Sequence, residues 1–470
     1  MKCSGDKGVS IVILAGGFGT RMKSTTPKVM HKICGREMLF CILDEVLKIS
    51  DDIHIILFNQ AESIAESLRK NYADSTLHTH LQDYDNFPGT AGAIMRGSAF
   101  KGDLNPCDST HCDSVRGDSN DFTSLDSAKL PIPTKHEKIL ILSGDMPLIR
   151  AEKLYEFIER ENDIVMGILE LRDATNYGRI VMQGNKVIKI IEEKDANKQE
   201  QQITLANAGI YCVKRQLLES ALPQIDSNNK QGEFYLTDIV KFSDDISGVK
   251  ADECDFMGVN SKLDLAKAEE FMLERLRNNA MQNGVIMHNP RSIYVECGVE
   301  FEGECEIESN VVLKGKSAIK NSKILSHTVV ESSVIKDSTI GPFARIRPNS
   351  IVESSHIGDF VEIKNSTLYE VKAGHLSYLG DSEIQSGTNI GAGTITCNFD
   401  GVKKHKTFIG KNVFVGSGVQ LVAPIVIEND VLIAAGSTVT KNAKSGDLVI
   451  SRTKQENKSG FFYRFFGGKE

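Results

Sequence analysis

An aliphatic residue that recurs every six positions dominates the last third of the chain. Near the C-terminus the pattern runs without a break through Ile409, Val415, Leu421, Ile427, Ile433 and Val439. The same spacing links Ile307 to Leu313 and Ile319, and Ile351 to Ile357 and Ile363. A six-residue repeat is typical of a parallel β-helix, in which each repeat supplies one short strand and a turn. From about residue 293 onward, the sequence therefore predicts triangular coils that bury their aliphatic residues by stacking.

The N-terminal part of the chain follows a different pattern. Near-continuous apolar runs at 9–14, 53–58 and 139–142 read as strands that are buried on both faces. Helix-like stretches separate these runs, which predicts a parallel α/β sheet. A chain of 470 residues is also too long for one ordinary core, so we expect two or three domains.

Charge and composition exclude several classes of partner. The net charge of −8 gives no basic bias toward nucleic acid. The apolar run at 9–17 is too short to span a bilayer and lacks a cleavage site, so we expect no membrane segment, no signal peptide and a cytoplasmic location. Ten scattered cysteines are then expected to be reduced thiols. Cys107 and Cys112, with His111 between them, have metal-ligand character, but their loose spacing favours a flexible loop.

Two segments connect these regions. Residues 101–137 are rich in Asp, Ser, Asn and Pro, which predicts a disordered surface insertion with no catalytic role. Residues 261–280 have helical apolar spacing and predict an amphipathic helix between the domains. Ser261, with Asp264 three residues later, resembles the capping pattern of a helix start.

A glycine-rich turn follows the first predicted strand. Gly16 and Gly17 allow a sharp turn that presents backbone N–H groups to a phosphate. Arg21 and Lys28 add two cations for phosphate oxygens. A tight turn with solvated charges is the alternative for the glycines alone, and a dinucleotide-binding turn has no use for Arg21. The combination therefore favours phosphate binding.

Asp145 follows the predicted strand at 139–142. A lone aspartate at a strand end more often caps a turn. Together with the glycine-rich turn upstream, Asp145 is better explained as a ligand of Mg²⁺, which would bridge nucleotide phosphates.

The motifs Leu14-Ala-Gly-Gly-Phe-Gly-Thr-Arg-Met, Pro27-Lys28 and Leu142-Ser-Gly-Asp-Met-Pro-Leu resemble the signature of sugar nucleotidyltransferases. Over about residues 8–453, the chain is similar to the bacterial bifunctional N-acetylglucosamine-1-phosphate uridylyltransferase/glucosamine-1-phosphate acetyltransferase family. The resemblance implies a cytoplasmic enzyme of UDP-N-acetylglucosamine synthesis, which supplies peptidoglycan and lipopolysaccharide for the cell wall. It would use acetyl-CoA, UTP and Mg²⁺ and act as a homotrimer.

For uridylyl transfer, the resemblance implies that Arg21 and Lys28 are catalytic and that Asn260 joins Asp145 on the metal. Gln82 with Gly89 and Thr90 resembles the segment that reads uracil, although Phe87-Pro88 departs from the usual pattern. Gly178, Glu192 and Asn207 would contact the sugar. The implied UTP and UDP-N-acetylglucosamine contacts are Leu14, Ala15, Gly16, Gly17, Lys28, Gln82, Gly89, Thr90, Gly178, Glu192, Asn207 and Asn260.

For acetyl transfer, the amine of the sugar must lose a proton before it attacks a thioester. A neutral imidazole is suited to accept that proton near pH 7, and His375 is the candidate. A lone histidine in a β-helix turn is normally a surface residue, but the surrounding motifs match the family. The residues implied for the glucosamine phosphate are Arg347, Lys364, Tyr378, Asn389 and Lys404. Those implied for acetyl-CoA and the acetyl-transfer site are Ala392, Asn398, Phe399, Ser417, Ala435 and Arg452.

The family's Lys404 loop reaches a neighbouring subunit, and Phe399 stands where the family usually has tyrosine. The tail at 461–466 either covers the coenzyme or is untethered. We expect a Rossmann-like uridylyltransferase domain at 1–260, a linker helix at 261–282 and a left-handed parallel β-helix at 283–470. The alternatives are a single-function sugar-1-phosphate nucleotidyltransferase with a structural or regulatory β-helix, and an inactive scaffold built on both folds.

Overall fold

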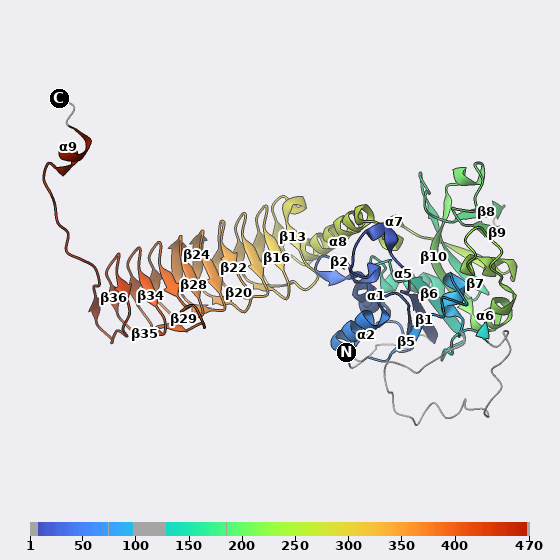
Figure 1. Ribbon diagram of the computed structural model, residues 1–470, viewed down its shortest axis with the longest axis horizontal. Helices are drawn as coiled ribbons and strands as arrows, with labels where there is room; N and C mark the ends of the chain where they lie inside the picture. The colour runs from blue at the N-terminus through green and yellow to red at the C-terminus, as the bar shows by residue number, and fades with distance from the viewer. Residues whose placement is uncertain (1–7, 74, 97–127, 185, 468–470) are drawn as a thin grey trace, which may run out of the picture. The chain divides into compact units, whose positions relative to one another are not determined.

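The computed structural model describes residues 8–73, 75–96, 128–184 and 186–467 (Figure 1). The chain divides into two compact units, Met1–Met272 and Leu273–Glu470. The division falls within helix α8 (Lys262–Gln282), the longest helix of the described chain.

The N-terminal unit is built on one mixed sheet with the strand order β11-β7-β10-β6-β1-β4-β5. Strands β6, β1 and β4 are parallel, as the sequence predicts, and β5, which was not predicted, extends the parallel part of the sheet. Strand β10 runs antiparallel to β6 and β7, which the prediction of a parallel sheet missed. It follows the β8–β9 hairpin, and an antiparallel neighbour needs no helical crossover. The strands are β1 (Val9–Leu14), β4 (Ile53–Leu57), β5 (Leu77–Leu81), β6 (Lys138–Ser143), β7 (Ile164–Glu170), β8 (Arg179–Gln183), β9 (Lys186–Ile191), β10 (Leu205–Lys214) and β11 (Ile246–Lys250).

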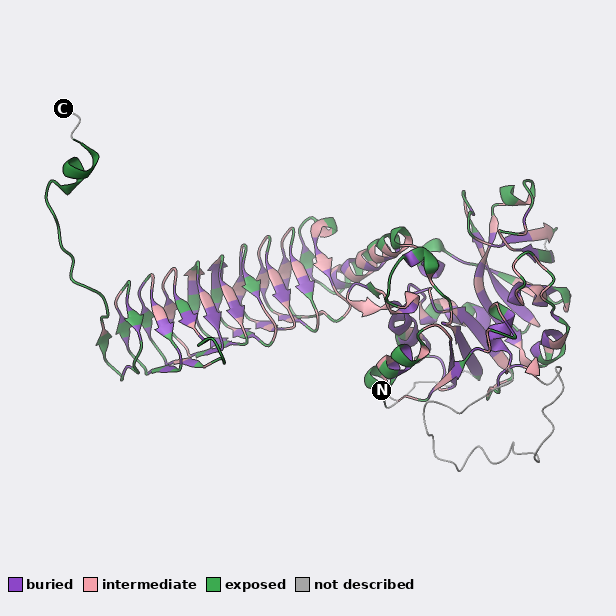
Figure 2. Ribbon diagram, viewed as in Figure 1, coloured by how far each residue is buried: buried purple, intermediate pink, exposed green. Residues whose placement is uncertain are grey.

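Helices and loops cover both faces of this sheet. Ile11 and Ile13 pack into one apolar core, whereas Val12 packs into a second core on the opposite face. Burial on both faces explains why the strand sequence is a continuous apolar run rather than an alternating one (Figure 2). The helices of this unit up to α8 are α1 (Met38–Val46), α2 (Ala61–Asn71), α3 (Thr90–Ile94), α5 (Ala151–Ile158), α6 (Arg215–Ala221) and α7 (Glu253–Phe256).

The predicted insertion at 101–137 lies mostly outside the described residues, as do Cys107, His111 and Cys112. Its last part, 128–137, is held by the fold. Ile132 donates its backbone N–H to Ile94 at 2.9 Å, and Lys135 donates its N–H to Asp52 at 2.9 Å. These backbone bonds join residues 128–137 to the α/β unit.

The C-terminal unit is a parallel β-helix, as predicted. Its strands run from β12 (Ile286–Met287) to β38 (Leu448–Val449) and form three sheets, one for each side of the triangular coils. The repeat residues from Ile409 to Val439 are buried and form the central column of the stack (Figure 2).

One part of the predicted repeat is wrong. Ile351 points outward with 45% of its surface exposed, and its neighbour Val352 is fully buried in its place. The buried column runs through Ile346, Val352 and Ile357, so one of these steps has five residues rather than six. Turns of unequal length shift the register, and a fixed six-residue count then selects the wrong residue.

Helix α8 begins as the sequence predicts. Asp264 accepts the backbone N–H of Ser261 at 2.8 Å, and Ser261 Oγ accepts the N–H of Asp264 at 3.2 Å. This reciprocal pair satisfies donors that the first helical turn leaves open. At the C-terminus, residues of the predicted tail form a short exposed helix, α9 (Phe461–Phe466).

Candidate functional site

The glycine-rich turn begins where β1 ends, at the carboxyl edge of the parallel strands. Gly144 donates its N–H to the carbonyl of Leu14 at 2.8 Å, which holds the loops after β1 and β6 together. Gly19 has a φ of 61°, and a Cβ there would lie 2.8 Å from Cβ of Lys28. A side chain at Gly19 would therefore push Lys28 away from the turn.

Two cations and two oxygen-bearing side chains converge beside this turn. Lys28 Nζ pairs with the carboxylate of Asp145 and donates to Asn260 Oδ1 at 2.7 Å. Arg21 donates to the same Asn260 oxygen at 2.9 Å and to Asn176 Oδ1 at 3.3 Å. Sequence analysis predicted Arg21, Lys28, Asp145 and Asn260 but gave Asn176 no role. The structure thus brings four residues from distant parts of the sequence to one point.

Asp145 is ionised in this setting. Burial by itself raises the pKa of its carboxyl group, but the charge of Lys28 and hydrogen bonds from Lys28 and Ser143 lower it below the ordinary value. Lys28 Nζ bridges the Asp145 carboxylate and the Asn260 amide oxygen. Hard oxygen donors of this kind suit Mg²⁺, which usually takes one or two protein carboxylates together with phosphate oxygens. The donor set therefore fits the predicted metal.

The predicted sugar residues lie around the start of β8 and the end of β9. Asn207 donates its backbone N–H to the carbonyl of Gly178 at 2.8 Å. Glu192 accepts a hydrogen bond from Thr237 Oγ1 at 3.1 Å, and burial raises its pKa. The nearby ion pair of 2.6 Å between Arg179 and Glu193 ties the two strand ends together.

The predicted uracil segment is rigidly held. Gln82 is buried, and its Nε2 donates to the carbonyls of Phe87 and Gly89 at 3.1 Å each. Thr90 Oγ1 accepts the N–H of Leu236 at 3.0 Å. At Phe87-Pro88, where the sequence departs from the family pattern, the chain therefore still forms a defined loop, in which Phe87 is buried.

In the β-helix, three predicted phosphate-binding cations lie together on one face. We call Arg347, Lys364 and Lys404 the cation cluster. The contact with Lys404, followed by the charge of Arg347, lowers the pKa of Lys364. The charge of Arg347 is balanced by an ion pair with Glu362, in which the nitrogen and the carboxylate oxygen are 2.8 Å apart. Mutual repulsion among cations is relieved by an anion, which is what a phosphate would supply.

The cation cluster forms within a single chain, whereas the resemblance implies that Lys404 serves a neighbouring subunit. The loop folds back on itself because Phe399 and Lys404 pair as an antiparallel bridge. His405 and Asp400 close the loop with a 2.7 Å ion pair. Phe399 and Val402 remain exposed on it.

A polar network borders the cation cluster. Asp381 accepts hydrogen bonds from Asn365 and Asn398, and Asn398 also reaches the hydroxyl of Tyr378 at 3.5 Å. A Cβ at Gly380 would lie 2.4 Å from that hydroxyl, so a side chain there would displace Tyr378 from this network. No role for Asp381 was predicted from the sequence.

His375 and the predicted coenzyme residues occupy equivalent places in successive coils. His375 ends strand β27 (Lys372–His375), whereas Ala392, Ser417 and Ala435 follow the later strands of the same sheet, and each of the four precedes a residue with positive φ. Ala392 accepts the N–H of Gly418 at 2.7 Å, and Arg452 donates to the carbonyl of Ala435 at 2.8 Å. We call this edge the left-handed corner. His375 is exposed on it, and Asn389 lies on the same sheet, in strand β30 (Asn389–Ile390), next to the strand that carries His375.

The residue at the left-handed corner changes in size along the stack. Its positive-φ position holds His327, Phe343, Phe360 and Leu376 in four coils, and Gly393, Gly418 and Gly436 in the next three. The first three side chains stack, with ring centroids 4.8 Å and 5.2 Å apart. In the three coils that carry glycine no side chain stands at this position, which leaves an open strip along the corner. We call Gly393, Gly418 and Gly436 the glycine strip.

Several supporting residues were missed because their signals are ordinary polar residues. Thr237 and Ser143 are single hydroxyls, and Glu362 is one of many outward-facing charges. Among these supporting residues, Asp381 had the clearest signal, since it follows closely after His375 and Tyr378, which the sequence did predict. The contacts between these residues depend on the folded chain.

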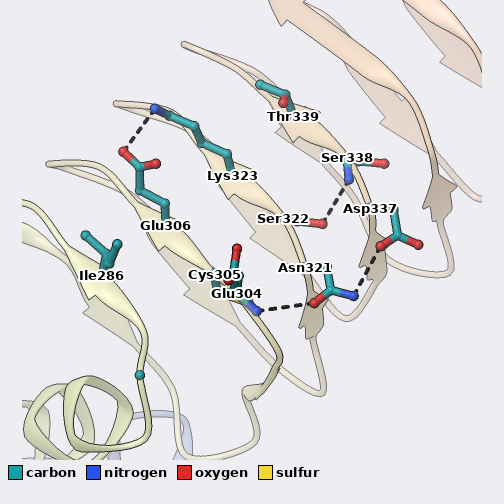
Figure 3. Close-up of a pocket in the computed structure, with 11 residues that line it drawn as sticks. Ile286, Glu304, Cys305, Glu306, Asn321, Ser322, Lys323, Asp337, Ser338 and Thr339 are labelled. Atoms are coloured by element: carbon teal, nitrogen blue, oxygen red, sulfur yellow. Dashed lines mark hydrogen bonds and ion pairs between the residues drawn. The ribbon is translucent and has the colours of Figure 1, made fainter.

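A cavity of about 540 Å³ lies elsewhere, on the first coils of the β-helix. Figure 3 shows Glu306 paired with Lys323, and Asn321 bonded to both Glu304 and Asp337. None of the predicted site residues lines this cavity. Its polar groups satisfy one another, and we assign it no ligand.

The fold and the two sites define a nucleotidyltransferase joined to a hexapeptide-repeat transferase. Family models agree: a MobA-like NTP transferase domain matches residues 11–177, a Nucleotidyl transferase 123–246, and a Bacterial transferase hexapeptide (six repeats) 406–441. Within the described residues, no helix has the length and apolarity needed to cross a membrane.

The chain belongs to the bifunctional GlmU family. It is 49% identical to Bifunctional protein GlmU of a Nitratiruptor species, covering 97% of this chain and 99% of that protein. Identity is 50% to the Helicobacter hepaticus protein, covering 98% of each chain, and 47% to that of Wolinella succinogenes, covering 98% and 100%. Among solved structures, an inositol-1-phosphate CTP transferase from T. maritima aligns with a TM-score of 0.39 at 15% identity, over 57% of this chain and 96% of that chain.

Family membership confirms the predicted function. The chain is a bifunctional enzyme with uridylyltransferase and acetyltransferase activity in UDP-N-acetylglucosamine synthesis. It uses nucleotide and acetyl-CoA substrates, and its hexapeptide repeats indicate an oligomer.

Proposed function

We propose that the chain acetylates glucosamine 1-phosphate at the left-handed corner and then uridylylates the product at the glycine-rich turn of the N-terminal unit. The observation that supports the proposal is that several members of each predicted residue set meet within one unit. Arg21, Lys28, Asp145 and Asn260 meet in one unit, and the cation cluster meets the Tyr378 network in the other.

In the uridylyl step, an oxygen of the sugar 1-phosphate attacks the α-phosphorus of UTP, and pyrophosphate leaves. The attacking phosphate is already ionised, so no general base is needed. Arg21 and Lys28 are suited to hold phosphate oxygens and to stabilise the charge that spreads over them. Gly178, Glu192 and Asn207 would orient the sugar. Positioning of the two substrates would then add to the rate enhancement that charge stabilisation gives.

Asp145 and Asn260 are the residues that would hold Mg²⁺. The metal, when bound, supplies charge neutralisation across adjacent phosphates. Lys28 would then move from its pair with Asp145 to the nucleotide phosphates. This exchange accounts for a lysine between two oxygens that are otherwise suited to a divalent cation.

In the acetyl step, His375 accepts a proton from the sugar amine, whose nitrogen attacks the thioester carbonyl of acetyl-CoA. The C–S bond breaks, and the departing sulfur takes the proton from His375, so that coenzyme A leaves as the thiol and the imidazole is neutral again. The cation cluster would bind the phosphate, with Tyr378 and Asn389 on the sugar. The glycine strip of the left-handed corner gives the coenzyme room beside Ala392, Ser417, Ala435 and Arg452.

The assembly proposed is a cytoplasmic homotrimer in which the coenzyme lies between adjacent β-helices. Large apolar side chains on the outer faces, Phe414 at 52% and Leu432 at 47% exposure, support burial against another copy. We also propose the domain division at 1–260, 261–282 and 283–470.

The two activities are separable by mutation. His375→Ala should abolish thiol release from acetyl-CoA with glucosamine 1-phosphate, and spare pyrophosphate release with UTP and N-acetylglucosamine 1-phosphate. Asp145→Ala should do the reverse. Both products are measured on the same purified protein, with Mg²⁺ present. Loss of both activities in either folded variant would contradict two independent sites.

A further inference from the structure

Three aromatic side chains gather at the carboxyl ends of β1, β4 and β5. Phe18 belongs to the glycine-rich turn, Phe58 follows β4 and Tyr84 follows β5. The rings of Phe58 and Tyr84 stack with centroids 4.7 Å apart. Phe18 stands edge-on to both, at 5.4 Å and 5.2 Å. We call these three residues the aromatic cluster.

The aromatic cluster is open to solvent on the side of Phe18. This phenylalanine is 51% exposed, although it is part of a turn built largely of glycine and polar residues. The exposed part of the ring offers a flat apolar face on which a planar ligand can stack.

The cluster adjoins the residue predicted to read the base. A Cβ built on Gly16 would lie 3.1 Å from Gln82 Oε1 and 3.1 Å from Cβ of Phe58. The turn, Gln82 and Phe58 are thus in contact. Because Nε2 of Gln82 donates to two backbone carbonyls, Oε1 is the atom left toward the turn as an acceptor.

Charge decides which part of a nucleotide fits here. Glu233 lies beside Gly89, where a built Cβ would be 2.9 Å from Cβ of Glu233. After burial, the charge of Glu233 is the second cause of the raised pKa of Tyr84. A negative group disfavours phosphates at this end of the site, whereas Arg21 and Lys28 attract them to the other end. The uncharged base is the part of the nucleotide that suits the aromatic end.

We propose that the aromatic cluster is a stacking platform for the pyrimidine base of the nucleotide, with Phe18 as the ring that the base covers. The inference rests on the proposed uridylyl transfer. Stacking on aromatic rings gives affinity for any base, so discrimination falls to the edge contacts of Gln82. The cluster sets affinity for the nucleotide and leaves the chemical step unchanged.

The chain contains no tryptophan, so Phe18→Trp creates a single emission reporter at the proposed platform. UTP and uridine should each quench or shift the emission, and tripolyphosphate should leave it unchanged. In parallel, Phe18→Ala should raise the KM for UTP roughly fivefold or more with kcat nearly unchanged. Ile188→Ala, which removes an exposed apolar side chain from strand β9 of the same unit, is the control and should leave the KM for UTP unchanged.

Two failures are distinguishable. If the unmodified chain releases no pyrophosphate from UTP and N-acetylglucosamine 1-phosphate, the proposed uridylyl function fails. If that activity is present but Phe18→Ala keeps the original KM for UTP, or tripolyphosphate alters the tryptophan emission as UTP does, the stacking platform is refuted. Tyr84→Leu provides a second variant in the same cluster, for which we expect a similar rise in KM.

Discussion

The substitution Gly418→Leu should block binding of the coenzyme while leaving the β-helix folded. Gly418 has a φ of 68°, and a Cβ there meets only Gly436 atoms at 4.0 Å, so the new side chain has space. Leu376 already occupies the equivalent corner position with a φ of 50°. A left-handed non-glycine residue costs about 1–2 kcal/mol, which a stacked fold of this length should tolerate.

The effect on function should be larger and selective. The leucine would fill the glycine strip beside Ser417, where we place the coenzyme. Forcing an extra side chain into a filled contact costs roughly 1–3 kcal/mol. This corresponds to a factor of about 5 to 150 in affinity. We therefore expect the KM for acetyl-CoA to rise within this range, with uridylyl transfer unchanged.

The assay is thiol release at varied acetyl-CoA, together with thermal unfolding of the same samples. Gly446→Leu is the matched control, since Gly446 has a φ of 83° and no atom within 4 Å of a built Cβ, but precedes a strand of the stack rather than occupying the left-handed corner. Both variants should lose similar stability, and only Gly418→Leu should lose affinity. An unchanged KM for acetyl-CoA in folded Gly418→Leu would refute the glycine strip as the coenzyme path.

Other predictions test the supporting residues. Burial raises the pKa of Glu192, so the folded state holds the proton more tightly than the unfolded state. The contribution of Glu192 to the free energy of unfolding is therefore complete below the pKa of the unfolded state, and it is lost as pH rises through the pKa of the folded state. Glu192→Gln should remove this dependence when the free energy of unfolding is measured at a series of pH values. Asp381→Ala should lower stability in urea by roughly 1.5–3 kcal/mol, because two amides lose a charged partner, and should impair acetyl transfer only. Ile390→Ala should lower stability by about 2–5 kcal/mol, because it opens a cavity in the buried column; a change under about 1 kcal/mol would contradict tight stacking.

Much of the fold was accessible from local patterns. The apolar run at 9–14 and the six-residue repeat from Ile409 depend on periodicity alone, and both elements formed where predicted. The repeat failed at Ile351 because turn length varies between coils. The antiparallel β10 was missed because strand direction depends on how the chain returns to the sheet, which apolar periodicity does not report.

The sequence by itself determined that this chain stacks aliphatic residues in coils and carries a glycine-rich turn after a buried strand, since both follow from the spacing of neighbouring residues. Only the tertiary structure decided which side chains meet. Asn260 contacts Lys28 across 232 positions of sequence. Phe18, Phe58 and Tyr84 form one cluster because three parallel strands end at the same edge. Contacts of this kind arise from the packing of distant segments, and no local pattern records them.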